Sequence, residues 1–344
     1  CHVDGRMDRL AWDLGDPSGS LGSLAGQHLG MNLPGLNTGF TSFHPMKGPM
    51  TTQTLQDIIG KEPLHWRGDR DGLEEFDEAF RLLQGADSAL GAVEMQEIED
   101  FLATIHFPPN PLRDFDNSLP SRGDLTGFES VGRFSPAGTQ LPDGDPNAGL
   151  SDYTTLALDG AFRCVTCHTL PTGMGADVRR IGGIYQDIAP GPDGEHHHAL
   201  VSVDGSTQRA FKVPQTRNVL EKSGFTMTRA RSLSGFGFLH DGSIPGISAF
   251  LSSPVFAFTS DQQLANMIAF QMCLTGSELP DGSPTDPLFP PGTASLDVHA
   301  GVGTQTTIVD AAALPPPHTA VFTAMVLEAE LGRIGMVAHV PVGA

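Results

Sequence analysis

The sequence has few lysines, few cysteines and no long apolar run, and these shortages restrict what the protein can bind. Only four of its 20 basic residues are lysines, against 40 acidic residues, which gives a formal net charge of −20. A surface of this charge repels phosphate backbones, so nucleic acid is excluded as a partner. The charge is explained either by simple solubility or by a partner with a basic face.

No segment of the sequence is predicted to span a membrane. The most apolar stretch, residues 320–340, is interrupted by Glu328, Glu330 and Arg333. A membrane span requires a run of about 18 apolar residues, which the chain does not contain.

The composition predicts short helices separated by long loops. The chain has 41 Gly and 27 Pro among 344 residues, and apolar residues make up 39%. Its length suffices for two domains of ordinary size, each with a modest apolar core. A cofactor buried in each half would supplement such a core.

Two of the four cysteines lie in the pattern Cys164-Val165-Thr166-Cys167-His168. This is the spacing of c-type haem attachment, in which two thiols add to the porphyrin vinyl groups and the adjacent histidine binds the iron. A zinc site would require a second pair of ligands, and a thioredoxin-like disulfide would require a βαβ context; the sequence has neither. We therefore predict covalent haem at Cys164 and Cys167, with His168 as the proximal ligand.

The chain opens with Cys1-His2, and an internal repeat indicates that this pair ends a second haem motif. Pro214 follows His168 by 46 residues (214 − 168), and Pro49 follows His2 by 47 residues (49 − 2). Around these prolines, residues 47–55 and 212–220 share Lys, Pro, Thr and Leu in register. A lipidated N-terminal cysteine or a chance pair would not explain this register. We expect Cys1 and His2 to hold a second haem, with the other cysteine of that motif before Cys1.

The repeat continues into two histidines that are candidate sixth ligands. Leu64-His65-Trp66-Arg67-Gly68 resembles Leu239-His240-Asp241-Gly242, and both copies then read G-x-x-x-G, an aliphatic residue, two further residues and Phe. The sequence predicts that His65 and His240 make each iron bis-histidine; the alternative is that they line the pocket wall. Other possible ligands are not duplicated: His44, Met46, Met50, Met174, Met227 and Met272.

These motifs resemble the di-haem cytochrome c peroxidase and MauG-like family over about residues 1–280. The resemblance rests on Phe211–Pro214, Arg217-Asn218 and Phe238–Gly242 in the second copy. The first copy is similar to a subgroup through Cys1–Arg6, Trp12–Gly15, His65–Asp69 and Phe107–Pro111. The resemblance implies two tandem c-type haem domains, which in this subgroup can follow a β-propeller. Where the peroxidases place an axial Met beyond the second-copy histidine, that stretch of this chain ends at Pro254.

Three functions are compatible with these motifs. The first is an extracytoplasmic electron-transfer cytochrome with a redox partner protein, since c-type haem is assembled in oxidising compartments. The second is a peroxidase or MauG-like oxidase, for which Glu94 is a candidate proton-shuttling acid. The third is an extracellular structural module in which haem stabilises the fold. The missing Met and the duplicated histidines favour the first.

The remaining polar clusters have simpler explanations. His196-His197-His198 lies in a Gly- and Asp-rich segment and is explained as a solvated loop. Residues 142–147 offer oxygen ligands for calcium but lack EF-hand spacing, so a calcium site is unsupported. Cys273 is expected to be a buried free thiol.

The fold class expected from the sequence is mainly α, loop-rich, with two duplicated c-type cytochrome domains. The predicted divisions are a first domain at 1–135, a linker at 136–150, a second domain at 151–280 and a small β-rich appendage at 281–344. Helices are expected at Thr52–Ile59, Leu73–Leu83 and Val93–Ile105, and after Gly246 and Ser260. Because the sequence begins within a motif and ends at an alternating run, we expect it to be part of a longer polypeptide.

Overall fold

The computed structural model describes eighteen segments of the chain. They are residues 1–8, 10–12, 22–23, 42–43, 49–60, 64–66, 70, 72–168, 170, 173, 178–181, 184–187, 200–202, 210–212, 214–223, 237–274, 299–308 and 316–339. For some residues of the helices and strands, only the backbone is described.

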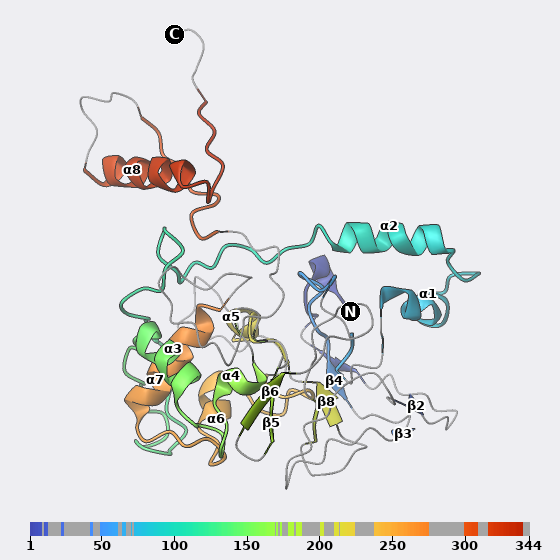
Figure 1. Cartoon of the computed structure of the whole chain (residues 1–344), viewed down its shortest axis with the longest axis horizontal. Helices are drawn as coiled ribbons and strands as arrows, with labels where there is room; N and C mark the ends of the chain where they lie inside the picture. Colours follow the sequence, from blue (N-terminus) through green and yellow to red (C-terminus); the bar gives the residue numbers. More distant parts are fainter. Residues whose placement is uncertain are drawn as a thin grey trace.

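The described chain is dominated by short helices joined by irregular segments (Figure 1). The α-helices are α1 (Asp77–Leu82), α2 (Ala92–Leu102), α3 (Pro146–Thr155), α4 (Cys164–Cys167), α5 (Val219–Lys222), α6 (Ile247–Leu251), α7 (Asp261–Met272) and α8 (Pro316–Glu330), with 3₁₀ turns η1 (Val3–Gly5) and η2 (Leu73–Phe76). The strands form antiparallel pairs: β1 (Ala11–Trp12) with β4 (Met50–Thr51), β2 (Gly22–Ser23) with β3 (Ser42–Phe43), β5 (Val178–Ile181) with β6 (Ile184–Asp187), and β7 (Leu200–Ser202) with β8 (Ala210–Lys212).

Helices α3 and α7 pack side by side and form the centre of the main core (Figure 1). Helix α7 begins at Ser260, whose hydroxyl accepts the Gln263 N–H at 3.2 Å, and buries most of its length. Helix α3 crosses it at Gly149, where a Cβ would lie 2.2 Å from the main-chain oxygen of Asn266. The sequence therefore needs glycine at this crossing, because any larger residue would push the two backbones apart.

The core extends further toward the N-terminus than the expected division at residue 135. Leu119, Leu125 and Leu141 are buried in the same cluster as α3 and α7. Helix α3 itself begins at Pro146, inside the predicted linker. Within the described residues, the segment from 119 onward thus packs with the second haem motif.

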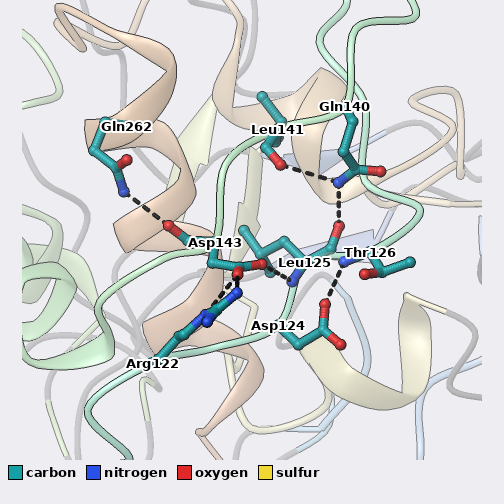
Figure 2. A network of polar contacts seen from close by, with 8 residues as sticks. All are labelled: Arg122, Asp124, Leu125, Thr126, Gln140, Leu141, Asp143 and Gln262. Atoms are coloured by element: carbon teal, nitrogen blue, oxygen red, sulfur yellow. Dashed lines mark hydrogen bonds and ion pairs between the residues drawn. The ribbon is translucent and has the colours of Figure 1, made fainter.

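The Asp-rich segment 142–147, for which the sequence does not support a calcium site, makes structural hydrogen bonds. Figure 2 shows Asp143 at its centre: the carboxylate accepts from Arg122 Nε at 2.6 Å, and its main-chain oxygen accepts from Gln262 Nε2 at 2.8 Å. The Asp145 carboxylate caps α3 by accepting the N–H groups of Asn147 and Ala148 at 2.9 and 3.3 Å. The Asp145 carboxylate therefore caps α3, and the Asp143 carboxylate holds the segment that contains Arg122.

Two expectations differ from the structure. Residues 52–59, predicted as a helix, form turns, and Asp57 has a positive φ of 51°. In the C-terminal segment, the described residues form the 15-residue helix α8 instead of strands. The run from Ala320 to Glu330 is rich in strong helix formers, and Pro316 suits a first helical turn, which outweighs the β-preference of its Thr and Val.

Helix α8 lies apart from the main body in Figure 1. Its buried residue Glu328 is charged and makes polar contacts. The Glu328 carboxylate, in a residue that is 2% exposed, lies 3.4 Å from His299 Nε2 and 3.2 Å from Arg333 Nη1.

Among the described residues, every helix is too short or too polar to cross a membrane.

Candidate functional site

Helix α4 presents the two motif cysteines on one face. Cys164 and Cys167 are three residues apart, so their side chains lie one helical turn from each other. Neither of them forms a disulfide. The helix ends at His168, whose N–H donates to the Cys164 carbonyl at 2.9 Å. A tight turn in which Asp159 bridges Phe162 precedes the helix and sets its direction.

The chemistry of these thiols differs from that of a redox or metal-binding pair. Burial raises the pKa of Cys164 to about 12, and the charge of Asp159 contributes. Burial and the same aspartate raise the pKa of Cys167 to about 12. Redox-active C-x-x-C cysteines have lowered thiol pKa values, because the thiolate is the reactive form. The two thiols are thus protonated at neutral pH.

Backbone carbonyl groups hold the His168 imidazole in place. Nδ1 lies 3.0 Å from the carbonyl oxygen of Gly173 and is therefore assigned as the donor. Burial lowers the pKa of His168, and hydrogen bonds to the carbonyls of Gly173 and Pro214 partly oppose this effect. A hydrogen bond from Nδ1–H to a carbonyl is the usual second-shell arrangement of a histidine that binds a metal through Nε2.

Two further residues position this histidine. Tyr153 of α3 is fully buried, and its hydroxyl donates to the His168 carbonyl at 2.7 Å. Gly173 has a positive φ of 66°, and a Cβ there would lie 1.7 Å from Thr216 Oγ1. Glycine at this position thus lets the loop that holds Nδ1 approach the repeated segment 212–220.

His2 is held by the first copy of that segment, whereas Nδ1 of His168 is bonded to the nearby Gly173. Its Nδ1 lies 2.9 Å from the carbonyl oxygen of Gln53. Loss of hydration lowers the pKa of His2, and the nearby charge of His65 acts in the same direction. The next glycine, Gly5, accepts the Leu55 N–H at 2.8 Å. In both halves, the histidine that follows the cysteine therefore lies against the repeated Lys-x-Pro segment.

The structure gives the two candidate sixth ligands different surroundings. The ring of His65 packs edge-on against Phe76, with centroids 4.6 Å apart. The main-chain oxygen of His240 accepts the N–H of Thr51 at 2.7 Å and its hydroxyl at 3.2 Å. His240 thus joins the second repeat to the first.

The other candidates have structural roles or lie outside the described residues. Glu94 is exposed, and its carboxylate accepts the Gly91 N–H at 2.7 Å, which caps α2. Met272 is buried in α7, and Met50 lies in β4. The remaining candidates fall on residues that are not described: His44, Met46, Met174, Met227 and His196-His197-His198.

An ion pair between the repeats was not evident from the sequence. Arg217, whose side chain is 0% exposed, pairs with the Asp57 carboxylate, whose side chain is 4% exposed. The guanidinium also stacks over Phe107, 4.9 Å from the ring centroid. Sequence reasoning missed this pair because its members are 160 residues apart, and the motif that contains Arg217 does not indicate a partner for it.

Lys222 lies between aromatic rings from both repeats. Its Nζ is 5.1 Å from the Trp66 ring centroid and 5.7 Å from that of Phe238. Burial lowers the pKa of Lys222 to about 8. The attraction of the ammonium group to the aromatic rings compensates only part of the hydration free energy that it loses on burial.

We expect this lysine to make stability rise with pH in alkaline solution. The unfolded lysine titrates near 10.5 and the folded one near 8, so between these values the unfolded chain binds more protons and stability increases with pH. The gain should be about 1–2 kcal/mol, since the side chain is only half-buried. Urea unfolding from pH 7.5 to 10.5 tests this. The variants K222M and K222R carry no group at this position that titrates in this range, so their free energy of unfolding should lack the rise. The prediction is wrong if the free energy of unfolding depends on pH in the same way for the wild type and both variants.

Comparison with protein-family models, with curated proteins and with solved structures found no match for this chain. Among the described residues, no group of three or more His, Cys, Asp or Glu side chains could hold a bare metal ion. The side chains around α4 instead fit a covalently attached haem: two thiols one helical turn apart, followed by a histidine whose Nδ1 is bonded to a carbonyl.

Proposed function

We propose that this chain is an extracytoplasmic di-haem c-type cytochrome that transfers electrons to or from a partner protein. The observation that carries the proposal is the geometry at α4, where Cys164 and Cys167 share one face and the Nδ1 of His168 is bonded to Gly173. The bond from His2 Nδ1 to the carbonyl of Gln53 also fixes that ring through Nδ1, which supports a second haem at Cys1 and His2. Haem would supply a one-electron redox centre at each site.

The chain's own residues would hold and tune these centres. Cys164 and Cys167 would bind the second haem through thioethers, and His168 would bind its iron. Tyr153 and Gly173 fix the position and orientation of His168. The carbonyl partners of both histidines keep Nδ1 protonated, which raises the basicity of the ligating nitrogen.

Electron transfer is favoured over peroxidase chemistry by the role of Glu94. A peroxidase needs an acid beside the open iron position to move a proton. The Glu94 carboxylate is exposed and caps α2, which explains its presence without catalysis. The net charge of −20 suits a redox partner with a basic face.

The proposal is tested by counting covalent haems. The full-length protein, produced in cells that attach c-type haem, should carry two haems that survive denaturation in mass spectrometry. The double variant C164A/C167A should carry one. C273A removes another buried thiol and should keep both haems.

The outcomes separate the parts of this proposal. A wild-type protein without covalent haem would refute it, and one haem in the wild type would remove the site at Cys1 and His2. A spectroelectrochemical titration should show reversible reduction of both haems. Haems that cannot be reduced reversibly would indicate the structural module instead.

A further inference from the structure

Helices α1 and α2 carry large apolar side chains that face solvent. Leu82 and Leu83 at the end of α1 are 74% and 63% exposed, and Val93 and Phe101 of α2 are 73% and 63% exposed. Together with Val3, in the turn after the first haem motif, they are five of the six most exposed large apolar residues in the described part of the chain. Single exposed apolar residues are ordinary, but a group of them in one region marks a surface that binds another molecule.

Helix α2 has apolar side chains on two sides. Met95 and Leu102, two turns apart, are buried and hold the helix to the protein. Val93 and Phe101 lie two turns apart on another side, with the exposed Glu97 one turn from each. The buried pair explains how the helix is held, so the exposed pair is left for a different contact.

The same region holds a large share of the negative charge. Residues 72–105 contain nine acidic residues and one basic residue, a net charge of −8 (1 − 9) within the total of −20. The acidic residues are Glu74, Glu75, Asp77, Glu78, Asp87, Glu94, Glu97, Glu99 and Asp100. About a tenth of the chain thus carries two-fifths of its net charge. Apolar residues with a charged rim are the usual composition of a protein–protein contact, and here the rim has one sign.

This charge limits what can cover the exposed apolar side chains. A second copy of the chain would bring the same charge of −8 to the contact, so self-association is opposed. Anionic lipid is repelled for the same reason. A protein with a basic face is attracted and oriented by the field of these carboxylates before contact. The surface therefore fits a basic protein partner.

The surface is joined to the first haem motif. A Cβ at Gly5 would lie 3.0 Å from the Ile105 side chain, and the Ile105 carbonyl oxygen accepts the Asp57 N–H at 2.8 Å. The Leu90 N–H donates to the Asp77 carboxylate at 2.8 Å, which ties the segment before α2 to the start of α1. Figure 1 shows both helices at the edge of the molecule, on the side of the N-terminus.

We propose that α1 and α2 form the docking surface for a basic redox protein, which exchanges electrons with the haem held by Cys1 and His2. This proposal rests on the proposed function. The exposed side chains of Leu82, Val93 and Phe101 would form the apolar centre of the contact, and the surrounding carboxylates its rim. In the transfer, one electron leaves the reduced partner and reduces the ferric haem of this chain, and no bond forms or breaks.

The experiment follows reduction of the full-length holoprotein by a reduced basic cytochrome c with lysines around its haem edge, in a stopped-flow instrument. V93S/F101S should lower the second-order rate constant by about five- to tenfold, because it truncates the apolar centre of the contact. E97Q should lower it by about twofold at low ionic strength and leave it unchanged at high salt, where the charges are screened.

Matched variants change exposed residues elsewhere. V255S/V337S removes two exposed apolar side chains and E330Q one exposed carboxylate, and both should keep the wild-type rate constant. Hydroquinone, a small uncharged reductant, should reduce the wild type and every variant at the same rate, since it does not need the docking surface.

Carbodiimide cross-linking of the same two proteins locates the contact, because it joins lysines to carboxylates. Mass spectrometry should find the adducts at residues 74–100. Equal rate constants for the α2 double variant and its apolar control, or adducts mainly outside these residues, would overturn the docking surface. A protein without covalent haem, or one that hydroquinone cannot reduce, would instead refute the proposed function.

Discussion

Replacing Arg217 by Met is expected to lower the free energy of unfolding by about 3–5 kcal/mol, which is the cost of leaving one member of a buried ion pair without its partner. The Asp57 carboxylate would stay buried at the contact between the repeats, 4% exposed, with no cation beside it. Met retains most of the volume of the arginine stem, so lost packing over Phe107 adds little. Urea unfolding of the holoprotein measures the change.

The control variants separate charge from packing. D57N tolerates the positive φ at this position, because Asn enters the left-handed region readily, and should also destabilise the protein by leaving Arg217 unpaired. The double variant R217M/D57N should recover most of the loss. R122M removes a surface partner of Asp143 whose side chain is 76% exposed, and should cost no more than about 1 kcal/mol. An equal loss in R217M and R122M would contradict the interpretation.

Replacing His168 by Gly is expected to remove the proximal ligand of the second haem while the thioethers keep the haem attached. One haem equivalent should lose its native spectrum, and added imidazole should restore it by entering the vacated position. The midpoint potential of that haem should also shift, since axial ligands tune haem potentials over about 0.8 V. Spectroelectrochemistry of the full-length protein measures both effects.

The exposed histidine of α8 provides the control for that variant. H318G leaves the haem motif intact and should keep both spectra and both potentials. If H168G keeps a native spectrum without imidazole, His168 does not bind iron, even if haem is attached to the neighbouring cysteines.

The local features of the fold could be predicted because they depend on neighbouring residues. Helix α7 begins at Ser260 as expected, since the cap needs only a hydroxyl and the following N–H groups. Helices α1 and α2 lie within the predicted ranges 73–83 and 93–105 to within one residue. The spacing of Cys164 and Cys167 also suffices to put both thiols on one helical face.

The features that sequence could not provide depend on distant contacts. Residues 52–59 have a helical pattern, but Asp57 takes a left-handed conformation where its carboxylate meets Arg217 from the other repeat. Tyr153 carries no motif, and its bond to His168 appears only once α3 and α4 are packed.

The Asp57–Arg217 pair also sets an order of assembly. The two residues are 160 positions apart, so on a chain made from its N-terminus the carboxylate is present long before the guanidinium. Before Arg217 has been synthesised, burial of the unpaired Asp57 carboxylate costs free energy. We therefore expect the region of the first half around Phe107 to remain solvent-exposed until then. We likewise expect a chain that ends before Arg217 to leave the Asp57 carboxylate exposed at the surface that contacts the second half in the complete protein.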